Sequence, residues 1–358
     1  MNATAHTPTE QSPAEAASAE WAPASWPAIS VIMPVLDEER HLADAVSQIL
    51  AQDYPGEVEL VIALGPSKDR TDQIAAGLTA ADPRVRTVPN PSGRTPSALN
   101  AAIAATRYEI VVRVDGHGLL GPGYLRAAVR LLAQTGADNV GGVMHAEGQS
   151  VFERAVAVAM TSKLGVGNAK FHTGGAAGPA ETVYLGVFRR ATLEKLGGYD
   201  EAFIRAQDWE LNHRILESGG LVYFSPELRV TYRPRPTFAA LAKQYLHYGR
   251  WRRVVMRTHT GTASLRYLAP PVVVLAVLAG TALGIAGIAT GVVPLYVGWL
   301  APLGYAVGIT AGALLESRGE AWPLRLRLPA VLATMHFSWG WGFLTSPKSL
   351  FRSTQHSK

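Results

Sequence analysis

Short apolar runs alternate with amphipathic stretches along the first third of the chain. The stretches at 38–51 and 69–80 have helical spacing, and Thr95 with Pro96 marks a third helix start, with Thr at the cap and Pro at the first helical position. This alternation predicts an α/β fold with a mostly parallel sheet and helices on both faces. Ligands of such sheets bind beyond the carboxyl ends of the strands, so the loops after these runs are the first candidates for a site. The apolar runs lie at 29–33, 58–63, 85–88 and 110–114.

A long uncharged run covers residues 268–315. It has about twice the ~20 residues that cross a bilayer as a helix. The Gly-Val-Val-Pro sequence at 291–294 supplies a turn, so the run predicts two helices near 268–290 and 294–315. A buried soluble core is the alternative, and the length of the run favours the membrane. A third apolar stretch, 328–346, is shorter and either spans the bilayer or lies in its interface.

Charge is unevenly placed around the uncharged run. The chain has a formal net charge of +5, yet no Asp or Glu occurs between Glu227 and Glu316, and Lys and Arg crowd the segment 228–267. Such a cluster beside an apolar segment is typical of a cytoplasmic membrane flank attracted to anionic lipid, and we expect no nucleic-acid partner. Basic residues before the first helix and after the second predict a multi-pass protein of the cytoplasmic (inner) membrane, with its catalytic domain facing the cytoplasm.

These patterns divide the chain into five segments. Residues 1–27 lack the features of a secretory signal and predict a disordered tail. We expect a catalytic domain at 28–227, a basic amphipathic juxtamembrane segment at 228–267, a transmembrane region at 268–347 and a C-terminal tail at 348–358. The chain has no cysteine, which excludes disulfides and thiolate chemistry and fits a cytosolic site.

Acidic side chains follow two of the predicted strands. Asp37 either caps the next helix or hydrogen-bonds a nucleotide base or ribose from a rigid strand end. Asp115 and His117 follow the fourth run, where a carboxylate and an imidazole two residues apart can converge on Mg²⁺ or Mn²⁺. The alternative for this loop is a simple Asp-Gly turn.

A further candidate acid lies far along the chain. Asp208 stands at the start of a segment with helical character that runs to Glu217, and it is either a helix cap or a functional acid. Glu210 has the four-residue spacing to Arg214 that favours an ion pair on one helix face.

Together these segments resemble the inverting glycosyltransferase family 2, with its GT-A nucleotide-sugar-binding fold, over roughly residues 28–255. The likeness extends to the membrane-anchored branch that includes succinoglycan-type glucosyltransferases. The segments that carry the resemblance share the family's order along the chain: 33–39, 51–55, 100–103, 113–117, 165–168, 182–186, 207–212 and 244–251.

The resemblance implies a role for each candidate residue. Asp115, with His117, would bind the divalent cation, Mg²⁺ or Mn²⁺, that holds the donor diphosphate, and Asp208 would be the catalytic base. Arg250 and Trp251 would either contact the diphosphate and stack on a sugar or form an interfacial Arg-Trp anchor. The residues implied to line the nucleotide pocket are Pro34, Asp37 and Glu39.

Two positions depart from the family pattern. Leu64 stands where the family often has a nucleotide-binding acid, and His117 replaces the second acid of the metal motif. The implied reaction moves a sugar from a nucleotide-sugar, UDP-glucose first, to a lipid-linked saccharide in exopolysaccharide or cell-surface glycan assembly, because a membrane anchor suits an acceptor built on a lipid carrier. The alternatives are a GDP-mannose donor, a polyprenyl phosphate acceptor, or a non-catalytic membrane scaffold that retains the fold.

Overall fold

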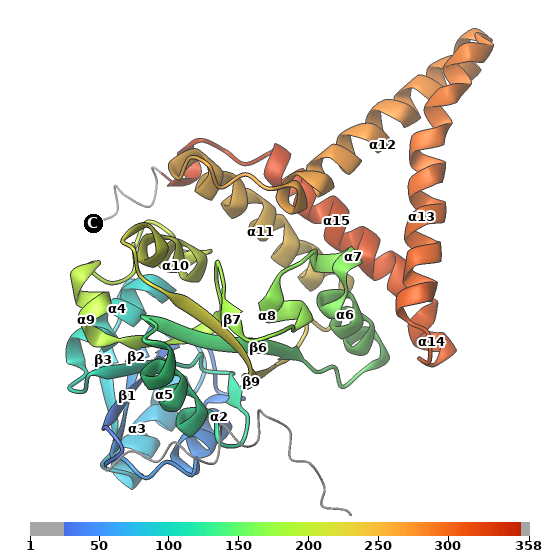
Figure 1. Cartoon of the computed structure of the whole chain (residues 1–358). Helices are drawn as coiled ribbons and strands as arrows, with labels where there is room; N and C mark the ends of the chain where they lie inside the picture. Colours follow the sequence, from blue (N-terminus) through green and yellow to red (C-terminus); the bar gives the residue numbers. More distant parts are fainter. Residues whose placement is uncertain (1–24, 352–358) are drawn as a thin grey trace, which may run out of the picture.

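The computed structural model describes residues 25–351 and contains an α/β domain followed by long apolar helices (Figure 1). Nearly all of the predicted N-terminal tail, 1–27, and most of the predicted C-terminal tail, 348–358, lie outside the described residues. Within the described part, nine strands form one sheet in the order β3-β2-β1-β4-β8-β6-β9-β5, with β7 paired to β9.

The first half of the sheet is parallel, and all of its strands except the outermost one are buried on both faces. β1 (Ile29–Val35) lies between β2 (Val58–Leu64) and β4 (Ile110–Arg113), and β3 (Val85–Pro89) follows on the outside of β2. Successive side chains of a strand point to opposite faces, so each face of these strands needs apolar residues. This explains why the strands appear in the sequence as nearly continuous apolar runs.

Helices cover both faces of the sheet, as the sequence predicts. On one face α2 (Leu42–Leu50), α3 (Thr71–Ala81) and α5 (Tyr124–Thr135) share one hydrophobic core with the strands. A second core lies on the opposite face, beneath α4, α9 and α10. Those helices span Thr95–Ala105, Arg190–Lys195 and Gln207–Glu217. The predicted cap of α4 is wrong by one residue, because Arg94 holds the N-cap position and Thr95 is already helical.

The second half of the sheet contains antiparallel pairings. β8 runs antiparallel to β4 and to β6, and β6 runs parallel to β9. The predicted domain boundary at residue 227 falls inside β9, so the sheet continues to Tyr232. The strands of this half are β5 (Leu119–Leu120), β6 (Asn139–Ala146), β7 (Gly178–Pro179), β8 (Tyr184–Arg189) and β9 (Val222–Tyr232).

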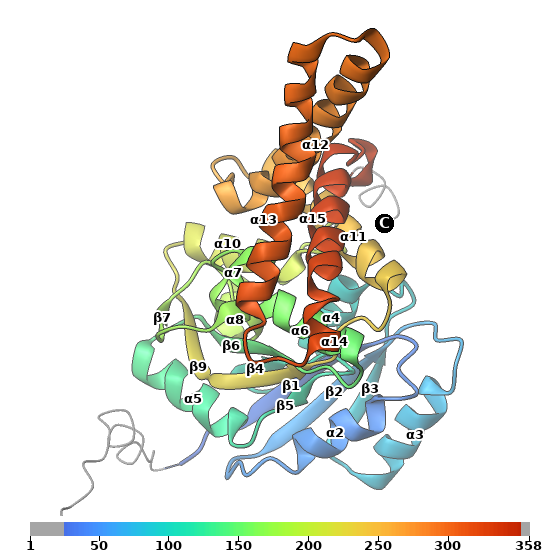
Figure 2. The same ribbon diagram turned by 90° about the vertical axis from the view of Figure 1, so that its right-hand side faces the viewer.

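Two apolar helices project from the domain as a hairpin (Figures 1 and 2). α12 (Leu265–Thr290) and the continuous helical segment Val293–Glu316, which joins η1 to α13, are each long and apolar enough to cross a membrane. These bounds agree with the helices predicted near 268–290 and 294–315. The remaining helices are α6 (Val151–Thr161), α7 (Lys163–Val166), α8 (Lys170–Thr173), α11 (Phe238–Thr258), η1 (Val293–Trp299), α13 (Leu300–Glu316), α14 (Trp322–Arg325) and α15 (Leu328–Leu344).

α15 packs closely on α11, between the α/β domain and the hairpin (Figure 2). The two backbones approach each other at glycines: a Cβ on Gly249 of α11 would lie 2.0 Å from the carbonyl oxygen of Trp339, and one on Gly342 of α15 would lie 2.2 Å from that of Leu246. The third apolar stretch of the sequence therefore forms a helix that is partly buried against the protein.

Candidate active site

A buried arginine joins the two carboxylates that the sequence singles out. Arg113 is the last residue of β4 and is only 2% exposed. Its Nε and one terminal nitrogen contact Asp115 Oδ1 at 3.1 and 3.0 Å, and its other terminal nitrogen forms an ion pair with Asp208. Burial opposes the charged guanidinium, but attraction to Asp115 and to the nearby tyrosines Tyr199 and Tyr184 together raises the pKa of Arg113. Two acids that are distant in sequence therefore share one cation.

Asp208 reaches this cation from the first turn of α10. The helix is preceded by Ala206 in the left-handed conformation, with φ of 62°, and no side chain caps it. The capping alternative for Asp208 is therefore wrong, and its carboxylate is directed at Arg113 instead. The predicted ion pair of Glu210 with Arg214 is confirmed, with Arg214 Nε 2.6 Å from Glu210 Oε1. The carboxylate of Glu210 is therefore already paired within the helix.

His117 is oriented by a second acid. Its Nδ1 lies 2.7 Å from Glu38 Oε1. This hydrogen bond raises the pKa of His117, with burial opposing the shift and Asp115 adding to it. Metal-bound histidines commonly donate their other ring N–H to a carboxylate, which fixes the tautomer. With Nδ1 on Glu38 and Asp115 Oδ1 on Arg113, the Nε2 of His117 and the Oδ2 of Asp115 remain for a cation, which suits Mg²⁺ or Mn²⁺.

The loop after β1 is fastened to the loop after β2. Asp37 has a left-handed backbone, with φ of 56°, and its carboxylate accepts a hydrogen bond from the Lys68 backbone at 2.7 Å. Because α2 begins at Leu42 with His41 at the N-cap, the helix-capping alternative for Asp37 is wrong. Glu39 accepts from the backbone N–H of Arg70 at 3.2 Å.

The other positions of this edge lie at the strand ends. Pro34 is in β1 and pairs in register with Ala63. Leu64, which departs from the family pattern, is the last residue of β2 and pairs with Val35. The pocket residues predicted from the family thus lie at the end of β1 and in the loop that follows it.

Arg250 and Trp251 lie on α11, in different surroundings. Trp251 is 2% exposed and packs with Phe203, at a ring distance of 6.3 Å, in a cluster that also includes Trp209. A ring this buried is not available to stack on a sugar or to anchor in a membrane interface. Both predicted roles of Trp251 are therefore wrong, and its side chain instead supports the segment around Asp208. Arg250 is half-buried, and its carbonyl accepts a hydrogen bond from Ser346.

Sequence reasoning gives no role to Arg113 or to Glu38, although both lie inside segments that carry the family resemblance. A charged residue within an otherwise apolar strand was the available signal for Arg113, because such a charge is buried only with partners. No local signal pairs Glu38 with His117, since they meet only after β1 and β4 lie side by side.

Comparison with known proteins places these features in a family. The sequence profile described as Glycosyl transferase family 2 matches residues 30–197. The succinoglycan biosynthesis protein ExoA of Rhizobium meliloti is 33% identical over 320 residues, which cover 87% of this chain and 93% of the relative. A dolichyl N-acetyl-alpha-D-glucosaminyl phosphate 3-beta-D-2,3-diacetamido-2,3-dideoxy-beta-D-glucuronosyltransferase of Methanococcus voltae is 22% identical over 238 residues, 64% of this chain and 74% of the relative.

A solved structure shares the fold. The mannosyltransferase PcManGT from Pyrobaculum calidifontis, determined in complex with GDP-Man and Mn²⁺, aligns with a TM-score of 0.59 and 22% identity. The alignment covers 89% of this chain and 88% of that one.

Proposed function

The chain belongs to glycosyltransferase family 2, and from this premise we propose that it is an inverting transferase in which Asp208 is the catalytic base. The observation that carries the proposal is the contact of Asp115 and Asp208 with one buried guanidinium, that of Arg113. Asp115 is expected beside the donor diphosphate and Asp208 beside the acceptor. In the structure the two acids contact different nitrogens of the same buried guanidinium.

The reaction is a single displacement at the anomeric carbon. The acceptor oxygen forms a bond to that carbon as the bond to the nucleoside diphosphate breaks, and Asp208 takes the proton of the attacking hydroxyl. A carboxylate suits this role because its unperturbed pKa leaves it ionised at neutral pH. Arg113 holds the carboxylate in place through their ion pair.

A divalent cation, Mg²⁺ or Mn²⁺, belongs to the proposal. Asp115 Oδ2 and His117 Nε2 would hold it, while Glu38 fixes the imidazole through Nδ1. The bound cation would neutralise the charge that develops on the departing diphosphate. Arg235 is exposed, and its charge acts against protonation of His117.

The donor is a nucleotide-sugar, and UDP-glucose is the first choice because of the resemblance to the succinoglycan branch. Pro34, Asp37 and Glu39 line the nucleotide side of the pocket in this proposal. Leu64 offers no hydrogen-bond acceptor in its side chain, so the loops after β1 and β2 must supply base recognition through Asp37 and the backbone. GDP-mannose, which PcManGT binds, is the second donor to test.

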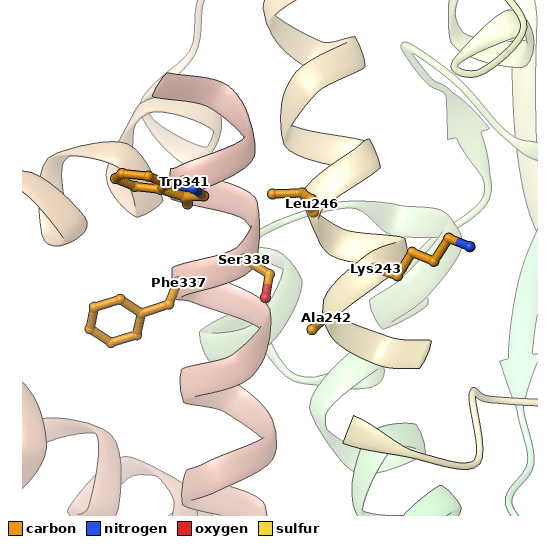
Figure 3. Close-up of a pocket in the computed structure, with 6 residues that line it drawn as sticks. All are labelled: Ala242, Lys243, Leu246, Phe337, Ser338 and Trp341. Atoms are coloured by element: carbon orange, nitrogen blue, oxygen red, sulfur yellow. The ribbon is translucent and has the colours of Figure 1, made fainter. Parts of the chain in front are cut away.

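The acceptor is a saccharide on a lipid carrier. The name of the Methanococcus voltae relative describes such an acceptor, a dolichyl-linked sugar phosphate. An apolar groove of about 310 Å³ between α11 and α15 supports this assignment, because it lies beside the helices that would enter the membrane. Figure 3 shows Leu246 and Ser338 facing each other across it, with Phe337 and Trp341 on the outer side of α15.

The site would face the cytoplasm from the inner membrane. Basic residues flank both ends of the apolar hairpin, including Arg266 in the first turn of α12 and Arg318 after α13, and positively charged flanks remain on the cytoplasmic side. In this proposed orientation the donor site would face the compartment where nucleotide-sugars are made.

The test is donor turnover by the detergent-purified protein with UDP- and GDP-sugars, Mg²⁺ or Mn²⁺, and a lipid extract as the acceptor source. We expect metal-dependent release of one nucleoside diphosphate that falls at least ~10²-fold in Asp208→Asn, the lower range of general-base contributions. Donor binding by Asp208→Asn should stay close to that of the unaltered chain.

Asp72→Asn is the matched control, because Asp72 is an exposed acid in the first turn of α3. Near-normal turnover by Asp208→Asn would overturn its assignment as the base. Release that is unchanged after removal of metal by EDTA would overturn the metal role of Asp115 and His117.

A further inference from the structure

We propose that His213, Glu217 and His259 form a binding site for a transition-metal cation of the zinc class, separate from the nucleotide-sugar site. His213 and Glu217 are one turn apart on α10, and His259 is the C-cap residue that follows α11. One ligand atom from each side chain lies within 4.8 Å of the other two. His213 Nε2 and Glu217 Oε1 are 3.2 Å apart, about the separation of two ligand atoms around tetrahedral zinc.

The two imidazoles have nitrogens to offer. The Nε2 atoms of His213 and His259 are buried, and neither makes a well-formed hydrogen bond within residues 25–351. Buried polar atoms almost always have a partner, so two such nitrogens at one place call for a ligand that accepts both lone pairs. A cation that also contacts Glu217 would satisfy them together.

Aromatic packing holds the rings in position. His213 stacks on Trp209, with ring centres 4.9 Å apart, and His259 meets the edge of His213 at 4.8 Å. Phe203 lies against the other side of His259 at 5.8 Å. Packing alone accounts for where the rings lie, but within residues 25–351 it gives neither Nε2 atom a well-formed hydrogen bond. Because the rings are already held in position, binding of a cation would cost less side-chain conformational entropy.

The ligand set distinguishes this site from the donor site. Two imidazoles and a carboxylate favour Zn²⁺ and Co²⁺, whereas Mg²⁺ prefers oxygen ligands. Glu210 lies 3.9 Å from His259 but is already paired with Arg214, so a water molecule would complete the coordination. Glu217 is 62% exposed, which gives the cation a path from solvent.

The position of the site gives it a structural consequence. α10 carries Asp208 in its first turn, and α11 packs on α15 next to the apolar hairpin. A cation between His213 and His259 would tie the helix of the proposed base to the helix that faces the membrane-directed part of the protein.

The experiment uses the full chain in detergent, stripped with EDTA and then given Zn²⁺ or Co²⁺. We expect one tightly bound Zn²⁺ per chain, an upward shift of about 5 °C in the thermal unfolding midpoint at saturation, and visible absorption of bound Co²⁺ typical of tetrahedral coordination. All three signals should persist in Asp115→Asn, which removes the donor-site ligand.

His213→Gln, His259→Gln and Glu217→Gln should each lose the Zn²⁺-dependent shift and the Co²⁺ spectrum. Glu217 is exposed, so its variant keeps the test meaningful if a histidine variant fails to fold. His145→Gln is the matched control, because His145 is an exposed histidine of β6. The proposal is overturned if Zn²⁺ stabilises Glu217→Gln as much as the unaltered chain, or if the bound Zn²⁺ is lost with Asp115.

Discussion

At the scale of single residues, Arg113 is the group on which both proposed active-site acids depend. Replacing it with Met would leave Asp115 and Asp208 as neighbouring like charges without their shared partner, and removing one member of a buried ion pair is strongly unfavourable. We predict that Arg113→Met lowers sugar transfer by at least ~10²-fold, since the base loses its position. Steady-state nucleoside diphosphate release, alongside a thermal melt, measures this.

Two companion variants sharpen that prediction. Arg113→Lys retains a charge but not the planar fork that contacts two carboxylates, so it should recover only part of the activity. Arg229→Met alters an exposed arginine whose side chain donates a hydrogen bond to the nearby backbone carbonyl of Pro226, and it should leave turnover unchanged. A folded Arg113→Met protein with normal turnover would show that the shared guanidinium is dispensable.

Glu38 acts on the metal site through His117. We predict that Glu38→Gln weakens metal affinity about 10-fold, because loss of such an outer carboxylate typically costs 10–100-fold. Titration of Mn²⁺ against donor binding gives the affinity. Asp44→Asn, an exposed acid on α2, should leave it unchanged. Equal affinity in Glu38→Gln and the unaltered chain would argue against His117 as a ligand.

Sequence reasoning identified the acids of the site because they follow strong local signals. Asp115 comes directly after an apolar strand, and Asp208 opens a helix. Their shared contact with Arg113 could not be predicted from spacing, since it forms only when the end of β4 and the start of α10 meet in the folded chain. Trp251 was predicted wrongly although a signal existed: with Val254 and Val255 it follows the i, i+3, i+4 spacing of a buried helix stripe.

At the scale of elements, the parallel strands were predictable and the later strands were not. β1 and β2 are buried on both faces and appear as unbroken apolar runs. β6 contains Gly141 and Gly142, and a Cβ on Gly142 would lie 1.8 Å from the Leu228 carbonyl oxygen of β9. The glycines of β6 allow close contact with β9, a strand that is distant in the sequence. Because glycine has low strand propensity, β6 gives a weak strand signal in the sequence.

The contact of α11 with α15 makes the next prediction. Ala is a better helix former than Gly by roughly 1 kcal/mol, so Gly→Ala stabilises an open helix. At Gly249 the added Cβ would meet the Trp339 backbone, and overpacking of this kind typically costs about 1–3 kcal/mol. We predict that Gly249→Ala lowers the unfolding midpoint, whereas Gly77→Ala in α3, with open space around it, does not. A midpoint for Gly249→Ala at or above that of the unaltered chain would contradict the close packing.

At the scale of the whole molecule, the apolar hairpin is the feature whose helices and bounds are predicted most closely from the sequence. Its helices expose large apolar side chains along their length, among them Leu275 and Ile285 of α12 and Leu303 and Val307 of α13. A soluble domain would bury such residues, so the hairpin fits a lipid environment. The sequence leaves two interpretations of α15, because its apolar stretch fits both crossing the bilayer and lying in its interface. Its glycine contacts with α11 now favour a position beside the domain.

Topology can be measured without background, because the chain has no cysteine. Single substitutions at exposed positions, Ala263→Cys before α12 and Glu320→Cys after α13, should react with a membrane-impermeant thiol reagent only from the cytoplasmic side. Val292→Cys, at the tip of the hairpin, should react from the opposite side. Lys348→Cys decides the status of α15: labelling on the same side as Ala263→Cys is expected if α15 stays packed on α11, and labelling beside Val292→Cys would mean that it crosses the bilayer.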